Sequence, residues 1–113
     1  MTNYIWITTQ FEGFHKYPNA PEEVAFLRQE HRHIFKVKVS IEVAHNERDI
    51  EFILFKRFIN KILSSSYFDN KSCETIADDI YEKIQEVPEY RFMGSYIACK
   101  RKIKIEVSED GEN

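Results

Sequence analysis

The sequence predicts an α+β domain in which two helices cover one face of an antiparallel β-sheet. The clearest observation is the stretch 31–45, where apolar and polar residues alternate as in a strand with one buried face. A second observation is a pair of segments, 51–63 and 72–88, whose apolar residues recur at helical spacing. Strands precede and follow this helical pair, and that order is typical of an antiparallel sheet with its helices on one side.

Length and composition fit a single domain over residues 1–113. A chain of 113 residues can bury a core of its own. Its 42% of hydrophobic and 14% of aromatic residues are typical of globular chains. The net charge of −3 argues against a general nucleic-acid-binding protein. One short basic cluster is interpreted as the solvated face of a hairpin: Lys100, Arg101, Lys102 and Lys104.

The cysteines and the N-terminus predict a cytoplasmic protein. Two isolated cysteines, Cys73 and Cys99, without an N-terminal signal segment are typical of a reducing compartment. No stretch approaches the ~20 apolar residues that a membrane span needs. We therefore expect no membrane partner.

The first predicted element is a strand over residues 3–15, where β-branched and aromatic residues dominate. Residues 16–30 hold Pro18 and Pro21 among polar residues and are expected to form a loop with room for one helical turn. This loop is longer than the usual hairpin connection, and long loops are often functional.

The second strand and the first helix follow from their apolar positions. In the strand over 31–45 these positions alternate with polar residues: Phe35, Val37, Val39, Ile41 and Val43. Residues 51–63 are predicted to be helical because their apolar residues fall on one helix face. That face comprises Phe52, Phe55, Ile59, Ile62 and Leu63.

A second helix is predicted to begin after Ser72, a suitable N-cap, and to stop before Pro88. Its apolar stripe comprises Ile76, Ala77, Ile80, Tyr81, Ile84 and Val87. Residues 90–98 and 101–108 are expected to be two further strands. The predicted order of elements is therefore ββααββ.

Three histidines are expected to meet at one end of the sheet. His31 and His33 stand two residues apart at the start of a strand, so both side chains project to one face, the face of Phe35. His15 ends the first strand and shares the parity of that strand's apolar residues. If the two strands pair as a hairpin, His15 lies beside His31 and His33.

Three neutral imidazoles at one place are a suitable first shell for Zn²⁺, and an open fourth position is typical of a catalytic zinc site. The alternative interpretation is that the His-x-His pattern is fortuitous and each ring is an ordinary hydrogen-bonded histidine at the core margin. His45 lies in a polar turn and is expected to be exposed.

Several motifs resemble those of the 6-pyruvoyl/6-carboxytetrahydropterin synthase family. Residues 11–15, Phe-Glu-Gly-Phe-His, are similar to its Phe-x-Ala-Ala-His zinc motif. Residues 31–35, His-Arg-His-Ile-Phe, resemble its His-Gly-His-x-Phe/Tyr motif. Residues 51–52, Glu-Phe, and 72–74, Ser-Cys-Glu, resemble the openings of its two helices. The resemblance covers most of the chain.

The resemblance implies the T-fold, or tunnelling fold, in which subunits join edge to edge into a β-barrel as trimers or hexamers. It implies that His15, His31 and His33 bind Zn²⁺. It further implies that the ligand is a small pterin, 7,8-dihydroneopterin triphosphate, in pterin or 7-deazaguanine synthesis. In that reaction the metal acts as a Lewis acid, a cysteine and an Asp-His pair move protons, and a late-strand glutamate anchors the pterin ring.

The chain lacks the usual proton-moving residues of the family. The family's cysteine precedes the His-x-His motif, where this chain has no cysteine over residues 26–30. Some relatives use glutamate there, so Glu30 is a candidate base, with a solvent-facing acid as the alternative. The Asp-His pair is absent, because no histidine follows His45, and residues 64–66 are serines.

Two further residues are candidates for ligand binding. Arg32 replaces the family's glycine within the His-x-His motif, and it either contacts a phosphate or is solvated. Glu106, in the context Lys-Ile-Glu-Val, resembles the pterin-anchoring glutamate, with a lysine-paired strand glutamate as the alternative. Cys73 is expected to serve packing.

Three functions remain open at this point. The first is a zinc-dependent synthase of the family. The second is a non-catalytic T-fold protein that holds a pterin-like or purine-like nucleotide, since guanine and pterin present the same amino-amide edge to a carboxylate. The third is a structural subunit whose zinc stabilises an oligomer. No nucleic acid is expected as a partner in any of them.

Overall fold

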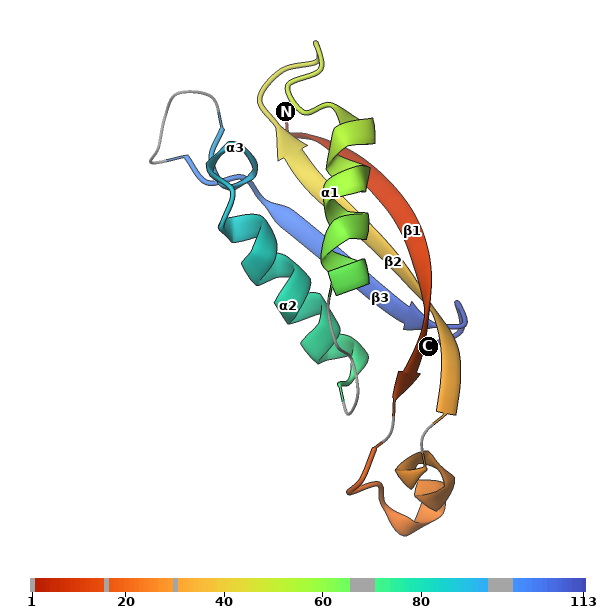
Figure 1. The fold of residues 1–113 in the computed structure, drawn as a ribbon. Coiled ribbons are helices and arrows are strands. Elements are labelled where there is room, and N and C mark those ends of the chain that lie inside the picture. Colours follow the sequence, from red (N-terminus) through yellow and green to blue (C-terminus); the bar gives the residue numbers. More distant parts are fainter. Residues whose placement is uncertain (1, 16, 30, 66–70, 94–98) are drawn as a thin grey trace.

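The computed structural model describes residues 2–15, 17–29, 31–65, 71–93 and 99–113; for residues 14, 15, 31 and 32 it describes the backbone alone. Within these residues the chain forms three strands, three α-helices and one 3₁₀ helix. Strands β1, β2 and β3 form one antiparallel sheet, and the two long helices lie together on one face of it (Figure 1). The α+β class and the helices on one face are thus confirmed.

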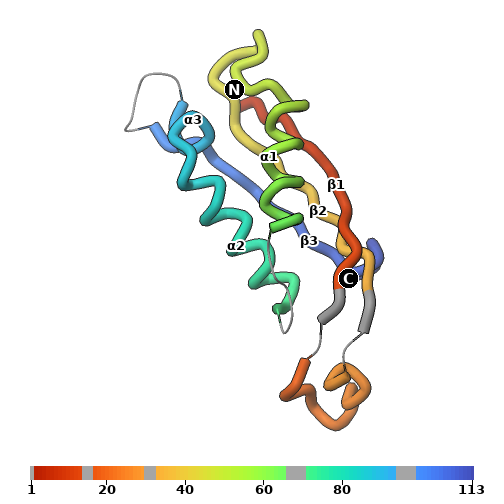
Figure 2. The backbone as a smooth tube through the Cα atoms, in the orientation of Figure 1, coloured from red at the N-terminus to blue at the C-terminus, as the bar shows by residue number. Residues whose placement is uncertain are grey.

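Strands β1 (Asn3–His15) and β2 (His31–Val43) form a long antiparallel hairpin. Their register pairs Asn3 with Val43 at one end and His15 with His31 at the other. Both predicted strands are confirmed, although β2 ends two residues earlier than the expected boundary at residue 45. The tip of the hairpin, residues 17–29, lies beyond the ends of the two long helices (Figure 2).

The predicted loop between these strands carries a 3₁₀ helix, Glu22–Arg28, at the tip of the hairpin. The Arg28 guanidinium donates to the Ala20 carbonyl from Nε at 3.0 Å and from Nη2 at 2.9 Å. The Tyr17 N–H donates to the Leu27 carbonyl at 2.6 Å. These bonds close the described part of the loop on itself, so the expected helical turn is present.

Strand β3 (Ile103–Glu109) pairs antiparallel with β2, and the sheet order is β1-β2-β3. Among the side chains that the structure describes, the odd-numbered ones of the strands face the helices: Ile7, Phe35 and Ile41 are buried, and Ile105 of β3 packs against the same core. The described even-numbered side chains lie on the opposite, open face, where Trp6 is 58% exposed. Lys38 Nζ lies 4.8 Å from the centroid of the Trp6 ring.

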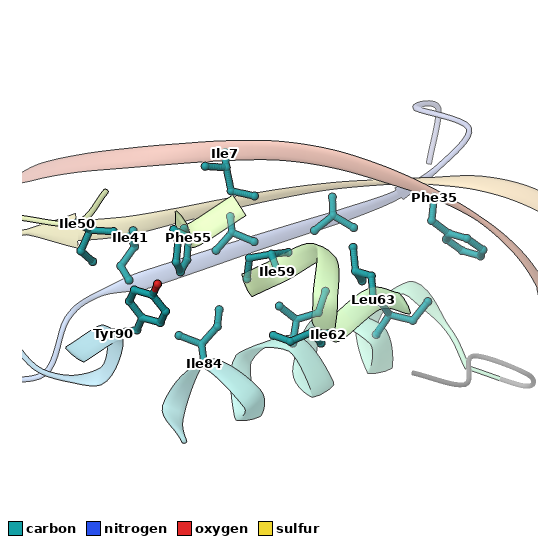
Figure 3. Close-up of a cluster of buried hydrophobic side chains, with 14 residues drawn as sticks. Ile7, Phe35, Ile41, Ile50, Phe55, Ile59, Ile62, Leu63, Ile84 and Tyr90 are labelled. Carbon is teal, nitrogen blue, oxygen red and sulfur yellow. The ribbon is translucent and has the colours of Figure 1, made fainter. Parts of the chain in front are cut away.

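Helices α1 (Phe52–Ser65) and α2 (Cys73–Gln85) supply the other half of the core (Figure 3). Ser72 caps α2 as predicted, because its hydroxyl accepts the Thr75 N–H at 3.2 Å. The helical core residues are Phe55, Ile59, Ile62, Leu63, Ile76, Ile80 and Ile84. Most residues of both predicted stripes are buried against the sheet, and burial of this apolar surface holds the two layers together. Tyr81 of the predicted α2 stripe is an exception, because it is 44% exposed.

The prediction of a buried apolar stripe on α1 is wrong for one residue, Phe52. Phe52 is 56% exposed, and its neighbours Ile53 and Leu54 are 52% and 55% exposed. Phe52 is the first residue of the helix and lies beyond the reach of the core residues that cover Phe55. The beginning of α1 therefore presents apolar side chains to the outside.

The predicted strand over 90–98 is wrong at its beginning. Residues Pro88–Arg91 form a short helix, α3, with proline at its first turn, where the missing N–H costs nothing. Tyr90 turns inward and packs edge-on against Phe55, with ring centroids 4.9 Å apart. Phe92 then bridges to Lys100, and residues 94–98 of the prediction lie outside the described residues. The observed order is ββααβ, apart from the short α3.

The prediction that the basic cluster is solvated is wrong for Arg101, which is buried. Its Nη1 donates to Asp49 Oδ2 at 2.8 Å and to the Glu42 carbonyl at 2.8 Å, and its Nε donates to the Glu89 carbonyl at 3.0 Å. Arg101 thus joins the end of β2, the turn before α1, and α3.

In the described part of the chain, no helix has the length and apolar character needed to cross a membrane.

Candidate metal and ligand site

The register of the β1–β2 hairpin brings the three predicted metal ligands to one end of the sheet. His15 stands directly opposite His31, and Gly13 stands opposite His33. The side chains of His15 and His31 lie outside the described residues, so their ring positions stay a prediction. The backbone places all three histidines within two rungs of one ladder, as the spacing predicts.

His33 is held by a carboxylate from the other edge of the sheet. Its Nδ1 lies 2.7 Å from Asp110 Oδ2, and the Ile34 N–H donates to the other oxygen, Oδ1, at 2.9 Å. The Ile34 N–H and the His33 ring both lower the pKa of Asp110 below its usual value. Because an ionised carboxylate only accepts, the hydrogen of this bond belongs to Nδ1 of His33.

A second carboxylate, Glu109, lies on the same face of the sheet. Its Oε2 is 3.9 Å from Nε2 of His33, and its side chain is 25% exposed.

The charge of Glu109 also affects the pKa of the Cys73 thiol at the start of α2. Burial raises the pKa of Cys73 to about 11, and the negative charges of Glu109 and Glu74 add to that rise. Cys73 is therefore a protonated thiol near neutral pH and no ready base.

Aromatic rings form the inner wall beside His33. Phe11 and Phe35 stack with ring centroids 5.1 Å apart, and the His33 and Phe35 rings meet edge to face with centroids 6.0 Å apart. A Cβ at position 13 would lie 3.3 Å from Phe35 and 3.4 Å from Phe11. Gly13 thus lets the two rings pack without the small shift that a side chain at this position would require.

The structure does not bring Glu106 to this site. Glu106 pairs with Lys38 across the ladder and belongs to the open face, whereas His33 belongs to the covered face. Its Oε1 lies 4.0 Å from Lys104 Nζ at an exposed position. These surroundings match the alternative interpretation, a strand glutamate paired with lysine. The ligand role of Glu106 stays a prediction.

The remaining predicted residues are only partly described. Glu30 and the side chain of Arg32 lie outside the described residues, so their roles stay predictions. His45 is exposed, as expected, and its Nδ1 accepts the Glu47 N–H at 3.1 Å. Ser64 and Ser65 stand where the resemblance would place the Asp-His pair, and their hydroxyls donate to the Lys61 carbonyl at the end of α1.

The described side chains supply only part of the predicted zinc ligand set. Among the side chains that the structure describes, no three His, Cys, Asp or Glu groups converge as metal ligands. His33 is the one predicted ligand whose ring is described, and its Nδ1–H bond to a carboxylate is the usual outer contact of a metal-bound histidine. The donor set of three imidazoles suits Zn²⁺.

Sequence reasoning missed Asp110 and Glu109. A parity count along the last strand would have indicated Glu109, which shares the odd-numbered face with Ile105 and Val107. Asp110 had a weaker signal, the Asp-Gly pair at residues 110–111, which is typical of a turn. Neither signal shows that the turn folds back onto His33.

Comparison with family models and with curated proteins found no match to this chain. The resemblance to the tetrahydropterin synthases therefore rests on the sequence motifs around the histidines and stays a prediction.

Proposed function

We propose that this chain is a divergent zinc-binding member of the 6-pyruvoyl/6-carboxytetrahydropterin synthase family. Its site would take a pterin such as 7,8-dihydroneopterin triphosphate. The observation that carries the proposal is His33, whose ring is held by Asp110 at the end of the sheet where the ladder also places His15 and His31. A bound zinc would supply Lewis-acid polarisation of ligand oxygens.

The residues beside His33 support ligand binding more than they support turnover. Glu109 offers a carboxylate that can accept the amino and ring N–H groups of a pterin, and the Phe11–Phe35 wall is apolar. The chain has no histidine after His45, and Cys73 keeps its proton near neutral pH. General acid–base groups contribute roughly 10²–10⁴-fold each, so turnover requires replacements for them.

A second candidate function is therefore binding without conversion, in which the protein holds a pterin-like or purine-like nucleotide. The raised pKa of Cys73 favours it, because the one cysteine near the site is not a thiolate. Turnover of 7,8-dihydroneopterin triphosphate separates the two candidates. A ligand-induced rise in melting temperature without turnover would support the binding protein.

The assembly expected of a T-fold is part of the same proposal. Strands β1 and β3 are the two edges of the described sheet, so each leaves one side of its backbone available to another subunit. Edge-to-edge pairing would close a trimer, and stacking would give a hexamer. We also infer a cytoplasmic protein, since both Cys73 and Cys99 are free thiols.

The deciding experiment measures zinc content and native mass on protein purified without added metal. We expect about one zinc per chain in a trimer or hexamer, and loss of stoichiometric zinc in His31→Ala and in His33→Ala. His45→Ala, an exposed histidine of the turn before α1, is the matched control and should keep its zinc. A full equivalent of zinc in both site variants would contradict the metal assignment.

A further inference from the structure

We propose that Asp110 is a positioning residue that holds the His33 ring with its hydrogen on Nδ1 and thereby presents Nε2 to the metal. The proposal rests on the zinc site of the proposed function. The contact from which it is argued is the hydrogen bond between His33 Nδ1 and Asp110 Oδ2, which is 2.7 Å long.

Three hydrogen bonds, two of them to the carboxylate, hold Asp110 against two consecutive residues of β2. Oδ2 accepts from His33 Nδ1, Oδ1 accepts the Ile34 N–H at 2.9 Å, and the Asp110 N–H donates to the Ile34 carbonyl at 2.7 Å. Because the backbone and both oxygens are engaged, the carboxylate cannot rotate away without losing two bonds. The ring of His33 is thereby restrained in orientation as well as in protonation.

The local backbone is shaped for this contact. Asp110 has φ +55° and Gly111 has φ +76°, both in the left-handed region that aspartate tolerates and glycine favours. The two residues directly follow β3, and the chain then returns to the end of that strand, where the Glu109 N–H donates to the Asn113 carbonyl at 3.0 Å. This turn places the Asp110 carboxylate beside His33 on the neighbouring strand.

The chemical consequence concerns the tautomer of the imidazole. With its hydrogen on Nδ1, a neutral ring carries its lone pair on Nε2, which is the form that binds a metal through Nε2. Metal-bound histidines usually donate their second ring N–H to a carboxylate or carbonyl, and loss of such a partner typically weakens metal affinity by about 10–100-fold.

The test compares wild type with Asp110→Asn and Asp110→Ala, with Asp78→Asn as the matched control on the exposed side of α2. In Asp110→Asn the amide oxygen can keep the Ile34 N–H, which leaves the NH₂ group facing Nδ1. The hydrogen of His33 is then expected to move to Nε2. Nitrogen NMR of the metal-free protein, about two pH units above the ordinary histidine pKa of ~6.5, reads the tautomer. Zinc affinity is measured by competition with a chelator.

We expect the Nδ1–H tautomer in wild type and in Asp78→Asn, and a shift towards Nε2–H in Asp110→Asn. Zinc affinity should fall by about 10–100-fold in both Asp110 variants and remain unchanged in the control. A wild-type ring that is doubly protonated or carries its hydrogen on Nε2 would overturn the proposal, as would an unchanged tautomer in Asp110→Asn. The expected tautomers in a protein that binds no zinc would support the hold on the ring and contradict the proposed function.

Discussion

At the scale of single residues, the face of the sheet decides which carboxylate can serve the site. Glu106 and Glu109 lie on one strand at an odd separation, so their side chains point to opposite faces. Glu109 shares the covered face with His33, whereas Glu106 shares the open face with Lys38. Two glutamates three residues apart on one strand therefore have different surroundings.

This difference predicts that Glu109→Gln weakens binding of a pterin or of GTP by about 1.5–3 kcal/mol, because charge-assisted hydrogen bonds to the ligand are lost. Glu106→Gln is the matched control, with the same change on the same strand, and we expect its affinity to equal that of wild type. Isothermal titration of both variants gives the comparison. Loss of affinity in Glu106→Gln alone would return the ligand role to Glu106.

At the scale of elements, Arg101 is the joint between the end of β2, the turn before α1, and α3. Its side chain is 4% exposed, and the Asp49 carboxylate that it meets is 11% exposed. The same guanidinium satisfies the carbonyls of Glu42 and Glu89, which belong to elements far apart in the sequence. Removal of one partner from such a buried pair leaves the other charge without compensation.

Arg101→Met is therefore expected to lower the free energy of unfolding by roughly 3–5 kcal/mol. Lys102→Met removes the same charge at the next residue, which is exposed, and should change the free energy of unfolding by less than about 0.5 kcal/mol. Urea denaturation near neutral pH checks both values. Equal effects of the two substitutions would contradict a structural role for Arg101.

The same pair predicts how stability depends on pH. The hydrogen bonds from Arg101 lower the pKa of Asp49 in the folded state below its usual 3.8. The stabilisation is complete above pH 3.8 and is lost as the pH falls through the lower folded pKa, since the unfolded state binds the proton more readily. The difference in free energy of unfolding between wild type and Arg101→Met should therefore shrink as the pH falls below about 4. A constant difference down to about pH 2.5 would contradict this assignment.

At the scale of the whole molecule, several exposed apolar side chains lie together beside one edge of the sheet. A groove between β1 and the beginning of α1 is lined in part by Trp6, Ile7, Phe52 and Ile53. Three of these side chains are more than half exposed in the single chain. Thr8, Lys56, Arg57 and Asn60 complete the lining. Exposed apolar side chains among polar ones, next to a strand edge, are typical of a subunit contact, which is consistent with the edge-to-edge assembly that we propose.

The assembly predicts that the double variant Phe52→Glu/Ile53→Glu lowers the native mass from a trimer or hexamer towards a monomer, because it places two charges in the contact. Phe26→Glu is the matched control, since Phe26 is 72% exposed on the 3₁₀ helix at the hairpin tip. Light scattering after size exclusion measures the mass, and circular dichroism checks the fold. A wild-type monomer, or an unchanged mass in the double variant, would contradict the contact.

Most elements could be predicted because their signals are local. The alternation from Phe35 to Val43 and the helical spacing in α1 and α2 depend only on which residues one buried face requires. The segment after Pro88 could not be read in this way. Tyr90 packs against Phe55 and Phe58 of another helix, and this contact favours a helical turn where the apolar composition had indicated a strand.

The sequence by itself determined the α+β class, the hairpin that pairs the histidine segments, and the shared face of His33 and Phe35. Each of these follows from the period of a strand or a helix, which needs no distant partner. Only the tertiary structure decided that Asp110 and Glu109, more than seventy residues further along the chain, stand beside His33, and that Arg101 is buried. The two carboxylates lie beside His33 because β3 pairs with β2 and ends next to that histidine. Arg101 is buried because the end of β2, the turn before α1, and α3 meet around it. No local pattern in the sequence specifies either contact.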